Sequence, residues 1–527
     1  MTRLPSQHLA DLSRDRRFLI RTSLSIVVMS TVLSFILAAF VPRKLGELLG
    51  QFPKQNLEVF HQAASQQDPQ SLNDWVFWIR FNHPVSSAAT SLDFRDFLRA
   101  EHGAIPEDRN SSFQKHPLLK SFYEGVQSDD RKESIEQLKS ISESLRYRNE
   151  FLGDLYILDK DYAAATNFYS REARQFPESS YAQRSAVIAA LRNDDTTAAR
   201  FLLNQSAISD RFSDYDLMNL QADARAWIPL LKSTFKYEKA QLLSFFIIPA
   251  AFTGLIWYLI LTNFWRFDRT RLIASLFAVA LGVLSANLTL YAVMIQERAF
   301  GFTHIPSSSQ VSQAIYFVAG VGLREETIKL ACFIPIAVWC ARRKNDLEAL
   351  ILAALVGLGF AAMENISYFR TGLIQQSGLT RLLTANPLHF TLTGLVGYYG
   401  YRMIVRKFHG MEEFLATFIL AVLFHGAYDA VIMIPEWADW SILTFILMAL
   451  LVYRYFDPLR GLMDIQQQRK RLSPLGIFIM GSVAIACIVM MVSAPFLGFH
   501  YALAGFAEAV GSILPLAFAY ISRFRDL

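Results

Sequence analysis

The chain has 527 residues, of which 53% are hydrophobic, and its formal net charge is +5. Such an apolar composition excludes an ordinary soluble enzyme, while the long polar stretches exclude a chain that lies in the membrane throughout. The small net charge gives no reason to expect a nucleic-acid partner. We therefore expect a membrane protein with one sizeable soluble domain.

The hydropathy pattern predicts an all-α, polytopic membrane protein with ten transmembrane helices. Runs long enough to cross a hydrocarbon core of ~30 Å lie near 19–41, 241–263, 272–295, 311–340, 347–369, 387–405, 413–434, 440–456, 474–496 and 500–522. The expected parts are a leader and first anchor (1–41), a soluble domain (42–239), two spans with an outer loop (240–310), a membrane core (311–435) and three final spans (436–527). Ala38 and Ala39 resemble a signal-peptide cleavage site, but the length of the first run favours an uncleaved anchor.

Basic residues gather in every second connection between these runs. They are Arg14, Arg16 and Arg17; Arg266, Arg269 and Arg271; Arg342, Arg343 and Lys344; Arg402, Arg406 and Lys407; Arg460, Arg469, Lys470 and Arg471; and Arg523 and Arg525. Because cytoplasmic loops carry the excess of Lys and Arg, both termini are expected in the cytoplasm. The 42–239 domain is then extracytoplasmic.

Within the soluble domain, residues 149–205 are expected to form paired helices that resemble the tetratricopeptide repeat. The matching positions are Leu152, Gly153, Tyr156, Ala165, Tyr169 and Pro177, with Ala199 and Leu203 one period later. Small residues at such points let two helices approach, and the aromatic fills the space between them. We expect a small helical domain that binds a peptide or a partner protein. A generic helical hairpin is the alternative, and residues 42–148 carry no motif.

The membrane core carries seven ionisable groups within its apolar runs. They are Glu325, Glu326, Lys329, Glu364, His389, His425 and Asp429. An isolated acid or base at mid-bilayer costs about 3 kcal/mol, so seven would cost on the order of 20 kcal/mol before pairing. Groups this costly, on neighbouring helices, favour a site for metal or proton chemistry over a set of unrelated structural pairs.

Helical spacing predicts how some of these groups are arranged. Glu325 and Lys329 are four residues apart and can form an ion pair, while Glu326 projects about 100° away from its neighbour. His425 and Asp429 share one helix face, so the carboxylate can orient the imidazole or both can approach one ion. Counted at ~1.5 Å per residue, Glu325 lies ~20 Å below the outer end of its helix and His389 within ~5 Å. A water-filled cavity open to the outside is expected to join the groups.

Each group also has a structural interpretation. Glu325 with Lys329 can be a buried structural pair, and His389 by itself is an ordinary interfacial histidine. Arg324 can be a further buried partner, and Glu508 is an acid in the last span that we leave outside the site. Three glycines, Gly394, Gly397 and Gly400, are expected to mark close helix packing.

The ordered set of Glu325-Glu326-x-x-Lys329, the segment 359–365 (GFAAMEN), His389 and His425-x-x-x-Asp429 resembles the PrsW family of intramembrane proteases. That family belongs to a wider clan with the CAAX prenyl endopeptidases, which carry Glu-Glu-x-x-x-Arg and Phe-x-x-x-His motifs instead. The resemblance covers about 311–435. It implies hydrolysis of a peptide bond in a membrane-associated protein, such as an anti-sigma factor, and a place in a bacterial cytoplasmic (inner) membrane.

The same resemblance implies roles for the site residues. Either Glu325 or Glu326 is the expected general base, and Lys329 places and tunes the other carboxylate. The expected ligands of a divalent metal, suspected to be zinc, are Glu364, His389 and His425, because catalytic zinc is held by such sets. Asp429 is expected to orient His425. A glutamate-protease mechanism without metal stays open.

Two other classes of function compete with a protease. A proton-coupled transporter or channel also uses intramembrane acids and histidines, although no second copy of the acidic motifs is visible. A receptor or scaffold with a degenerate membrane site is the other alternative. For a protease, we expect the soluble domain to recruit or exclude substrates.

Overall fold

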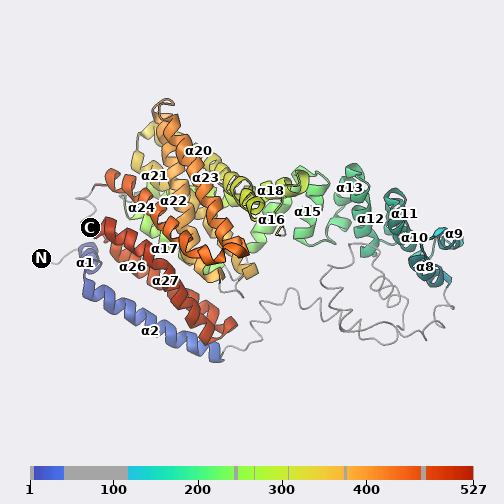
Figure 1. Cartoon of the computed structure of the whole chain (residues 1–527), viewed down its shortest axis with the longest axis horizontal. Coiled ribbons are helices and arrows are strands. Elements are labelled where there is room, and N and C mark those ends of the chain that lie inside the picture. Colours follow the sequence, from blue (N-terminus) through green and yellow to red (C-terminus); the bar gives the residue numbers. More distant parts are fainter. Residues whose placement is uncertain are drawn as a thin grey trace. The chain divides into compact units, whose positions relative to one another are not determined.

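The computed structural model describes residues 5–40, 117–242, 247–265, 268–306, 308–372, 377–464 and 471–525. These residues form helices joined by short connections, and no strand occurs among them (Figure 1). The chain divides into two compact units, one of residues 1–48 with 238–527 and the other of residues 49–237. The predicted all-α class is confirmed.

The helical unit begins, within the described residues, at Pro117. Its helices are α8 (Pro117–Gln127), α9 (Lys132–Ser140), α10 (Arg148–Leu158), α11 (Tyr162–Gln175), α12 (Ser180–Arg192), α13 (Thr196–Leu203), α14 (Ser206–Ser209), α15 (Asp214–Asp223) and α16 (Trp227–Gln241), whose last turn reaches the other unit. Asp161, Ser179 and Asp195 cap α11, α12 and α13 by accepting a backbone N–H, as N-cap side chains do. Residues 42–116 of the predicted soluble domain lie outside the described residues.

The paired helices predicted between 149 and 205 are present. A Cβ atom on Gly153 would lie 2.6 Å from the Tyr169 ring, so α10 and α11 approach only because this residue is glycine. Asp154 accepts hydrogen bonds from the hydroxyls of Tyr169 at 2.5 Å and Tyr181 at 2.7 Å, which ties α10 to α11 and α12. Membership of the tetratricopeptide family stays a prediction.

The membrane unit contains the helices that carry the predicted spans. They are α2 (Arg16–Phe40), α17 (Ile247–Thr262), α18 (Arg269–Ala299), α19 (Gln310–Ile315), the π-helical η2 (Tyr316–Gly322), α20 (Leu323–Arg343), α21 (Asp346–Gly372), α22 (Ser377–Val405), α23 (Met411–Met433), α24 (Ser441–Leu462), α26 (Pro474–Leu497) and α27 (Phe499–Phe524), with the short α1 (Pro5–Leu12) and η3 (Pro435–Trp440). The N-terminal α2 packs along α26 (Figure 1).

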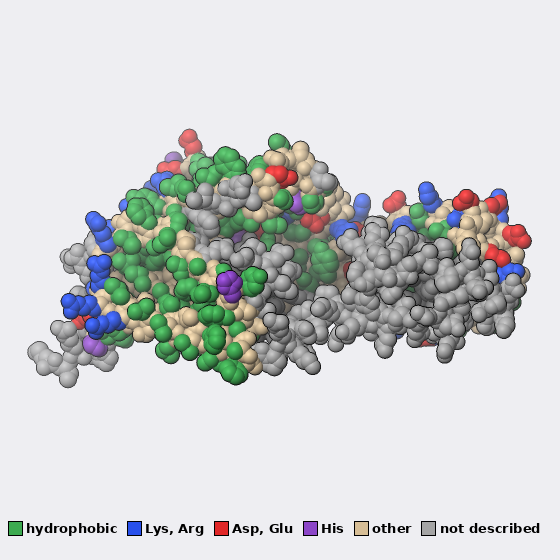
Figure 2. Space-filling model, turned by 60° about the horizontal axis from the view of Figure 1, so that its bottom comes forward, with side chains coloured by type: hydrophobic (Ala, Val, Ile, Leu, Met, Phe, Trp, Pro, Cys, Tyr) green, Lys and Arg blue, Asp and Glu red, His purple; other side chains and the backbone are tan. Residues whose placement is uncertain are grey.

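Each of the ten predicted spans overlaps a described helix. Among the described helices, α2, α18, α21, α23 and α26 are long and apolar enough to cross a membrane by length and composition. Large apolar side chains such as Leu24, Met29 and Phe518 are 63%, 72% and 75% exposed, and Figure 2 shows hydrophobic side chains spread over one face. Lipid contact accounts for such a surface. The total of ten spans stays a prediction.

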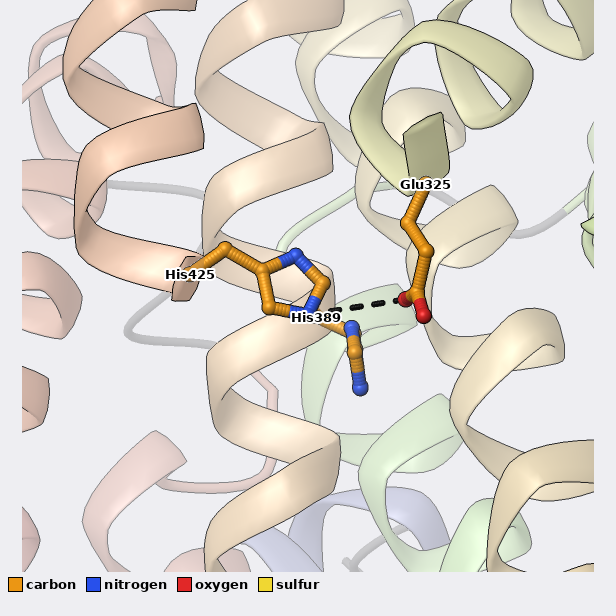
Figure 3. A group of neighbouring side chains, drawn as sticks. All are labelled: Glu325, His389 and His425. Carbon is orange, nitrogen blue, oxygen red and sulfur yellow. Dashed lines mark ion pairs between the residues drawn. The ribbon is translucent and has the colours of Figure 1, made fainter. Parts of the chain in front are cut away.

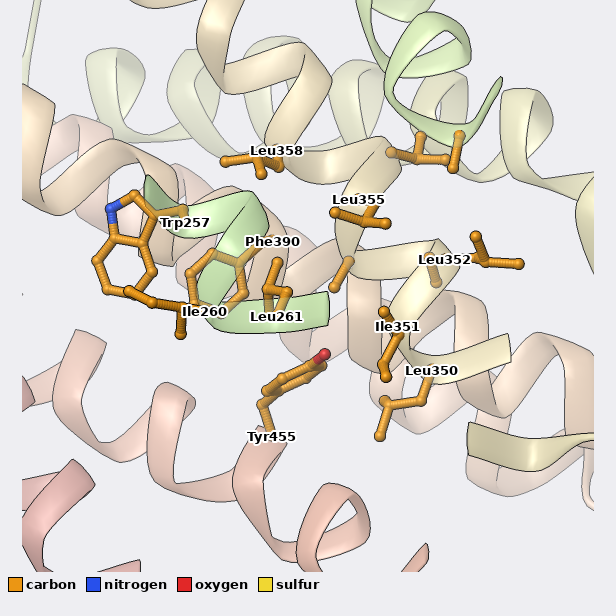
Figure 4. Close-up of a cluster of buried hydrophobic side chains, with 14 of the residues drawn as sticks. Trp257, Ile260, Leu261, Leu350, Ile351, Leu352, Leu355, Leu358, Phe390 and Tyr455 are labelled. Carbon is orange, nitrogen blue, oxygen red and sulfur yellow. The ribbon is translucent and has the colours of Figure 1, made fainter. Parts of the chain in front are cut away.

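Helix α21 lies at the centre of the membrane unit. Residues 349–356 are all fully buried, as expected for a helix that is apolar all round. Beside it, the ring of Phe390 contacts those of Trp257 and Tyr455 at tilted and edge-on angles, with ring centroids 5.2 Å and 5.7 Å apart (Figure 4). A Cβ atom on Gly357 would lie 2.3 Å from the backbone oxygen of His389, so α21 and α22 touch by their backbones beside that histidine.

The close packing predicted for the glycines of α22 is confirmed at two positions. A Cβ atom on Gly394 would lie 2.6 Å from the ring of Tyr455, and one on Gly397 would lie 2.5 Å from the Cβ atom of Ala353. For Gly400 the nearest atom, on Phe414, is 3.3 Å away, which is a looser contact.

The predicted start of α22 and the predicted depth of His389 are wrong. The apolar run begins near 387, but the helix begins at Ser377 and continues through Pro387. His389 is therefore 12 residues into the helix, or ~18 Å from its first residue. His389 thus lies deeper within its helix than predicted, and it contacts Lys329 of α20.

Candidate active site

Two glutamates of α20 contact the amine of Lys329, which lies on the same helix. This amine lies 3.3 Å from Glu325 Oε2 and 3.0 Å from Glu326 Oε1, and 3.8 Å from the centroid of the Phe360 ring. The lysine side chain is fully buried, so its charge is stable there only with these partners. The prediction that Glu326 projects away from the lysine contact is wrong, because both glutamates reach the ammonium.

His425 joins α23 to this pair of glutamates. Its Nδ1 lies 2.8 Å from Glu326 Oε1, and its Nε2 lies 3.5 Å from both Glu325 Oε2 and Asp429 Oδ2. Since a carboxylate oxygen only accepts, the short contact assigns the proton of the neutral ring to Nδ1. The Nε2 lone pair then faces Glu325 and Asp429. The orienting contact that we expected from Asp429 is made by Glu326.

His389 is held by two groups of opposite hydrogen-bonding character. Lys329 lies 2.9 Å from Nδ1, and Glu364 Oε2 lies 2.7 Å from Nε2. An ammonium can only donate and a carboxylate can only accept, so the neutral ring carries its proton on Nε2. The Nδ1 lone pair therefore points toward the lysine and the centre of the cluster.

Glu325, His389 and His425 form a group that could hold a metal ion. One ligand atom from each lies within 4.8 Å of the others, and all three residues are buried (Figure 3). The predicted ligand set included Glu364 in place of Glu325. Glu364 stands behind His389, on the ring nitrogen that carries the proton.

The chemistry of this donor set fits a divalent metal. Each histidine donates its other ring N–H to a carboxylate, which is the arrangement that typically orients metal-binding imidazoles. Two imidazoles and one carboxylate are a known set for catalytic zinc. The cluster also holds four carboxylates but one ammonium. Two of the carboxylates contact Lys329 and the other two contact the histidines, so added positive charge is favoured there.

Glu326 retains one uncommitted oxygen. Its side chain is fully buried, Oε1 contacts Lys329 and His425, and Oε2 has no hydrogen-bond partner among the described residues. An unsatisfied buried carboxylate oxygen is costly and calls for an explanation, such as a water or a reacting group. Glu325 and Glu326 are thus distinct: the first belongs to the possible ligand group, and the second has an oxygen free to accept a proton.

The π-helical segment η2 and two glycines bring α20 and α23 together. A Cβ atom on Gly322 would lie 2.6 Å from the backbone oxygen of Val422, and one on Gly426 would lie 2.4 Å from the Cα of Val318. The backbones of η2 and α23 therefore touch at two points beside His425. Wide π-turns within longer helices often occur at functional sites.

Two buried asparagines were missed by the sequence reasoning. The Asn365 amide donates to Asn386 Oδ1 at 3.3 Å, and both side chains are fully buried between α21 and α22. Asn365 follows Glu364 directly, and Asn386 precedes His389 by three residues, so the pair links the helices that hold these groups. Asparagine at helical spacing from a histidine in an apolar run was the signal that could have found them. The side chain of Glu508 lies outside the described residues.

A buried cluster of acids, histidines and a lysine within apolar helices marks a functional site, and comparisons with known proteins indicate its class. Residues 270–454 match the family model described as PrsW family intramembrane metalloprotease. Protease PrsW of Clostridioides difficile (strain 630) is 24% identical over 177 residues, which cover 33% of this chain and 73% of that protein. No solved structure matches. Together these findings support a PrsW-like intramembrane peptidase, and the matched segment includes every residue of the cluster.

Proposed function

We propose that the protein hydrolyses a peptide bond in a membrane-associated protein and that Glu325, His389 and His425 hold the catalytic divalent metal, with zinc as the expected ion. The observation that carries this proposal is the pair of oriented imidazoles. Their lone pairs converge with Glu325, while Glu326 and Glu364 accept hydrogen bonds from the opposite ring N–H groups. This proposal assigns Glu325 as a ligand and Glu364 as the group that orients His389.

Glu326 is the proposed general base. A bound divalent cation would make a water more acidic and polarise the scissile carbonyl. Glu326 Oε2, which has no partner among the described residues, accepts the proton that this water loses. The hydrogen bond from His425 to Oε1 holds the carboxylate in place for that transfer.

Lys329 is the proposed charge-balancing residue. Adjacent Glu325 and Glu326 would repel each other in a buried site, and the ammonium, 3.3 Å and 3.0 Å away, offsets that repulsion,. The lysine amine also contacts His389 Nδ1, so it would have to move away from that nitrogen before the nitrogen could bind a metal. This competition predicts that metal affinity and the position of Lys329 are coupled.

Glu364 and Asp429 are the most exposed acids of the cluster, at 18% and 15% for their side chains. We therefore place the water entrance beside them. Under the proposed topology, with cytoplasmic termini, this entrance opens to the outside of a bacterial cytoplasmic membrane. The substrate class that we propose is a membrane-associated regulator such as an anti-sigma factor.

The test is cleavage of a co-reconstituted panel of single-span membrane proteins by the full chain. Glu326→Gln should lower the rate by about 10²- to 10⁴-fold, because it removes the general base and keeps the shape. His425→Ala should abolish cleavage, and a zinc chelator should abolish cleavage by the unchanged chain. Added zinc should restore the chelated enzyme.

Glu297→Gln is the matched control. Glu297 lies in the same unit and accepts from the Tyr316 hydroxyl at 2.8 Å, a bond that glutamine can keep. This variant should cleave normally. If cleavage is lost in the site variants but the chelator has no effect, the mechanism is that of a glutamate protease without a metal. If both site variants still cleave, the cluster takes no part in the reaction.

A further inference from the structure

A groove of about 200 Å³ lies between α22, α23 and α24. Its apolar wall is formed by Leu392, Leu395, Leu420, Phe424, Leu450 and Leu451. Leu420 and Leu450 are 54% and 56% exposed. Both leucines thus line the groove and face the outside of the unit, and Leu420 lies on a helix that is apolar enough to cross a membrane. The groove is thus open toward the region where lipid chains lie.

One end of the groove is polar. Arg454, Asp457 and Tyr399 line it there. Asp457 is already paired with Arg523. Arg454 is exposed and has no hydrogen-bond or ion-pair partner among the residues that the structure describes. The groove therefore presents a guanidinium with unused donors beside an apolar channel.

We propose that this groove binds an anionic phospholipid, with the phosphate on Arg454 and one acyl chain along the leucine-lined wall. The planar guanidinium matches a phosphate through paired hydrogen bonds. Arg454 lies eight residues before the end of α24, or ~12 Å along the axis, and a long arginine side chain can extend from that depth to the headgroup layer. Arg402 and Arg406, at the same end of the bundle, each lie 4.0 Å from Glu413, so their charge is already offset and Arg454 is the cation left for the phosphate.

The lining favours a lipid over a peptide segment as the occupant. An unwound peptide brings backbone N–H and C=O groups that must be satisfied inside a membrane. The wall formed by Leu392 and Phe424 is apolar and offers such backbone groups few hydrogen-bond partners. An acyl chain has no such requirement, and the single free cation stands at the end where one phosphate would lie.

The groove ends close to the site. Leu392 is three residues after His389, and Ala421, which also lines the groove, is four residues before His425. Each is one helical turn from a histidine. A bound chain thus packs against the segments of α22 and α23 that carry both imidazoles. Any effect on cleavage rests on the proposed function, whereas lipid binding itself does not.

The experiment is native mass spectrometry of the full chain, stripped of lipid in detergent and titrated with dioleoyl phosphatidylglycerol or dioleoyl phosphatidylcholine. Phosphatidylglycerol should bind more tightly. Arg454→Gln should weaken its binding ~5-fold, the effect of one basic residue near an anionic lipid. Leu420→Trp should abolish the first bound lipid, because the larger ring fills the groove.

Arg406→Gln is the matched control. Arg406 is exposed at the same end of the bundle but does not line the groove, so its removal should leave binding unchanged. Equal losses in the Arg454 and Arg406 variants, or equal affinity for the two lipids, would overturn the proposal. So would a photo-crosslinker at position 420 that captures a substrate's transmembrane segment and is not displaced by phosphatidylglycerol. Because binding is read without any cleavage assay, its outcome is independent of the proposed protease activity.

Discussion

At the scale of single residues, the proton positions on the two histidines decide what the site can bind. His389 donates to Glu364, and His425 donates to Glu326, so the remaining lone pair of each ring faces inward, where that of His389 contacts Lys329. Neutral imidazoles with these tautomers are ready to accept a metal. The carboxylates behind them therefore matter as much as the ligands.

Glu364 is the place to test this arrangement. Glu364→Leu leaves the Nε2 proton of His389 without an acceptor and lets the ring turn, so we expect metal affinity to fall by about 10- to 100-fold. Glu364→Gln keeps an acceptor oxygen and should retain most of the affinity. Competition with a fluorescent zinc chelator measures both. Equal zinc affinity in the leucine variant and the unchanged chain would contradict the orienting role of Glu364. Complete loss of zinc binding in the leucine variant would show that Glu364 is itself a metal ligand.

The residue types of the site could be predicted from the sequence, but their contacts only in part. Burying acids, histidines and a lysine in apolar helices costs too much free energy unless they have partners. This argument predicted from the sequence that the groups form a cluster. The direction of Glu326 could not be predicted from its own helix, because His425 on α23 supplies the partner that turns it toward the cluster. Which carboxylate orients His425 likewise depends on packing between helices.

At the scale of elements, the site depends on where helices begin and how closely they pack. The apolar runs predicted α21 and α23 well, because those helices are apolar through most of their length, whereas the run near 311–340 covers α19, η2 and α20 together. The early start of α22 was missed because residues 377–386 are more polar than a span and Pro387 resembles a helix start. The π-helical turns of η2 have no compositional signal, since they result from register and packing.

Gly426 tests the contact between η2 and α23. Gly426→Ala places a methyl group 2.4 Å from the Cα of Val318, so the backbones must separate. A shift of about 1 Å can cost 10²-fold in rate, and we expect a loss of that order in cleavage. Gly461→Ala is the control, because nothing lies within 4 Å of its added Cβ atom.

Thermal unfolding in detergent should accompany the cleavage assay for both glycine variants. Overpacking of a core typically costs about 1–3 kcal/mol, so Gly426→Ala should stay folded at the assay temperature while its rate falls. Normal cleavage by Gly426→Ala would show that the close contact does not set the position of His425.

At the scale of the whole molecule, the site belongs to one unit alone. Every residue of the cluster lies between 325 and 429, within the membrane unit, and the helical unit has a core of its own. Removing residues 50–235 and joining the ends with a flexible linker should therefore leave metal binding intact. If the helical unit recruits or excludes substrates, the excised protein should process some members of the single-span panel faster or slower than the full chain.

Gly153→Leu complements the excision, because it disturbs the helical unit and keeps the chain complete. The larger side chain would meet the Tyr169 ring, where even a Cβ atom comes within 2.6 Å, and should unfold the α10–α11 pair. Both variants should then change the order of preference among substrates in the same direction, with zinc content unchanged. Unchanged processing of every substrate by a folded excised protein would rule out recruitment. A change seen only on excision would show that the unit acts through its bulk or the length of its tether, because the folded surface of α10 and α11 would then be dispensable.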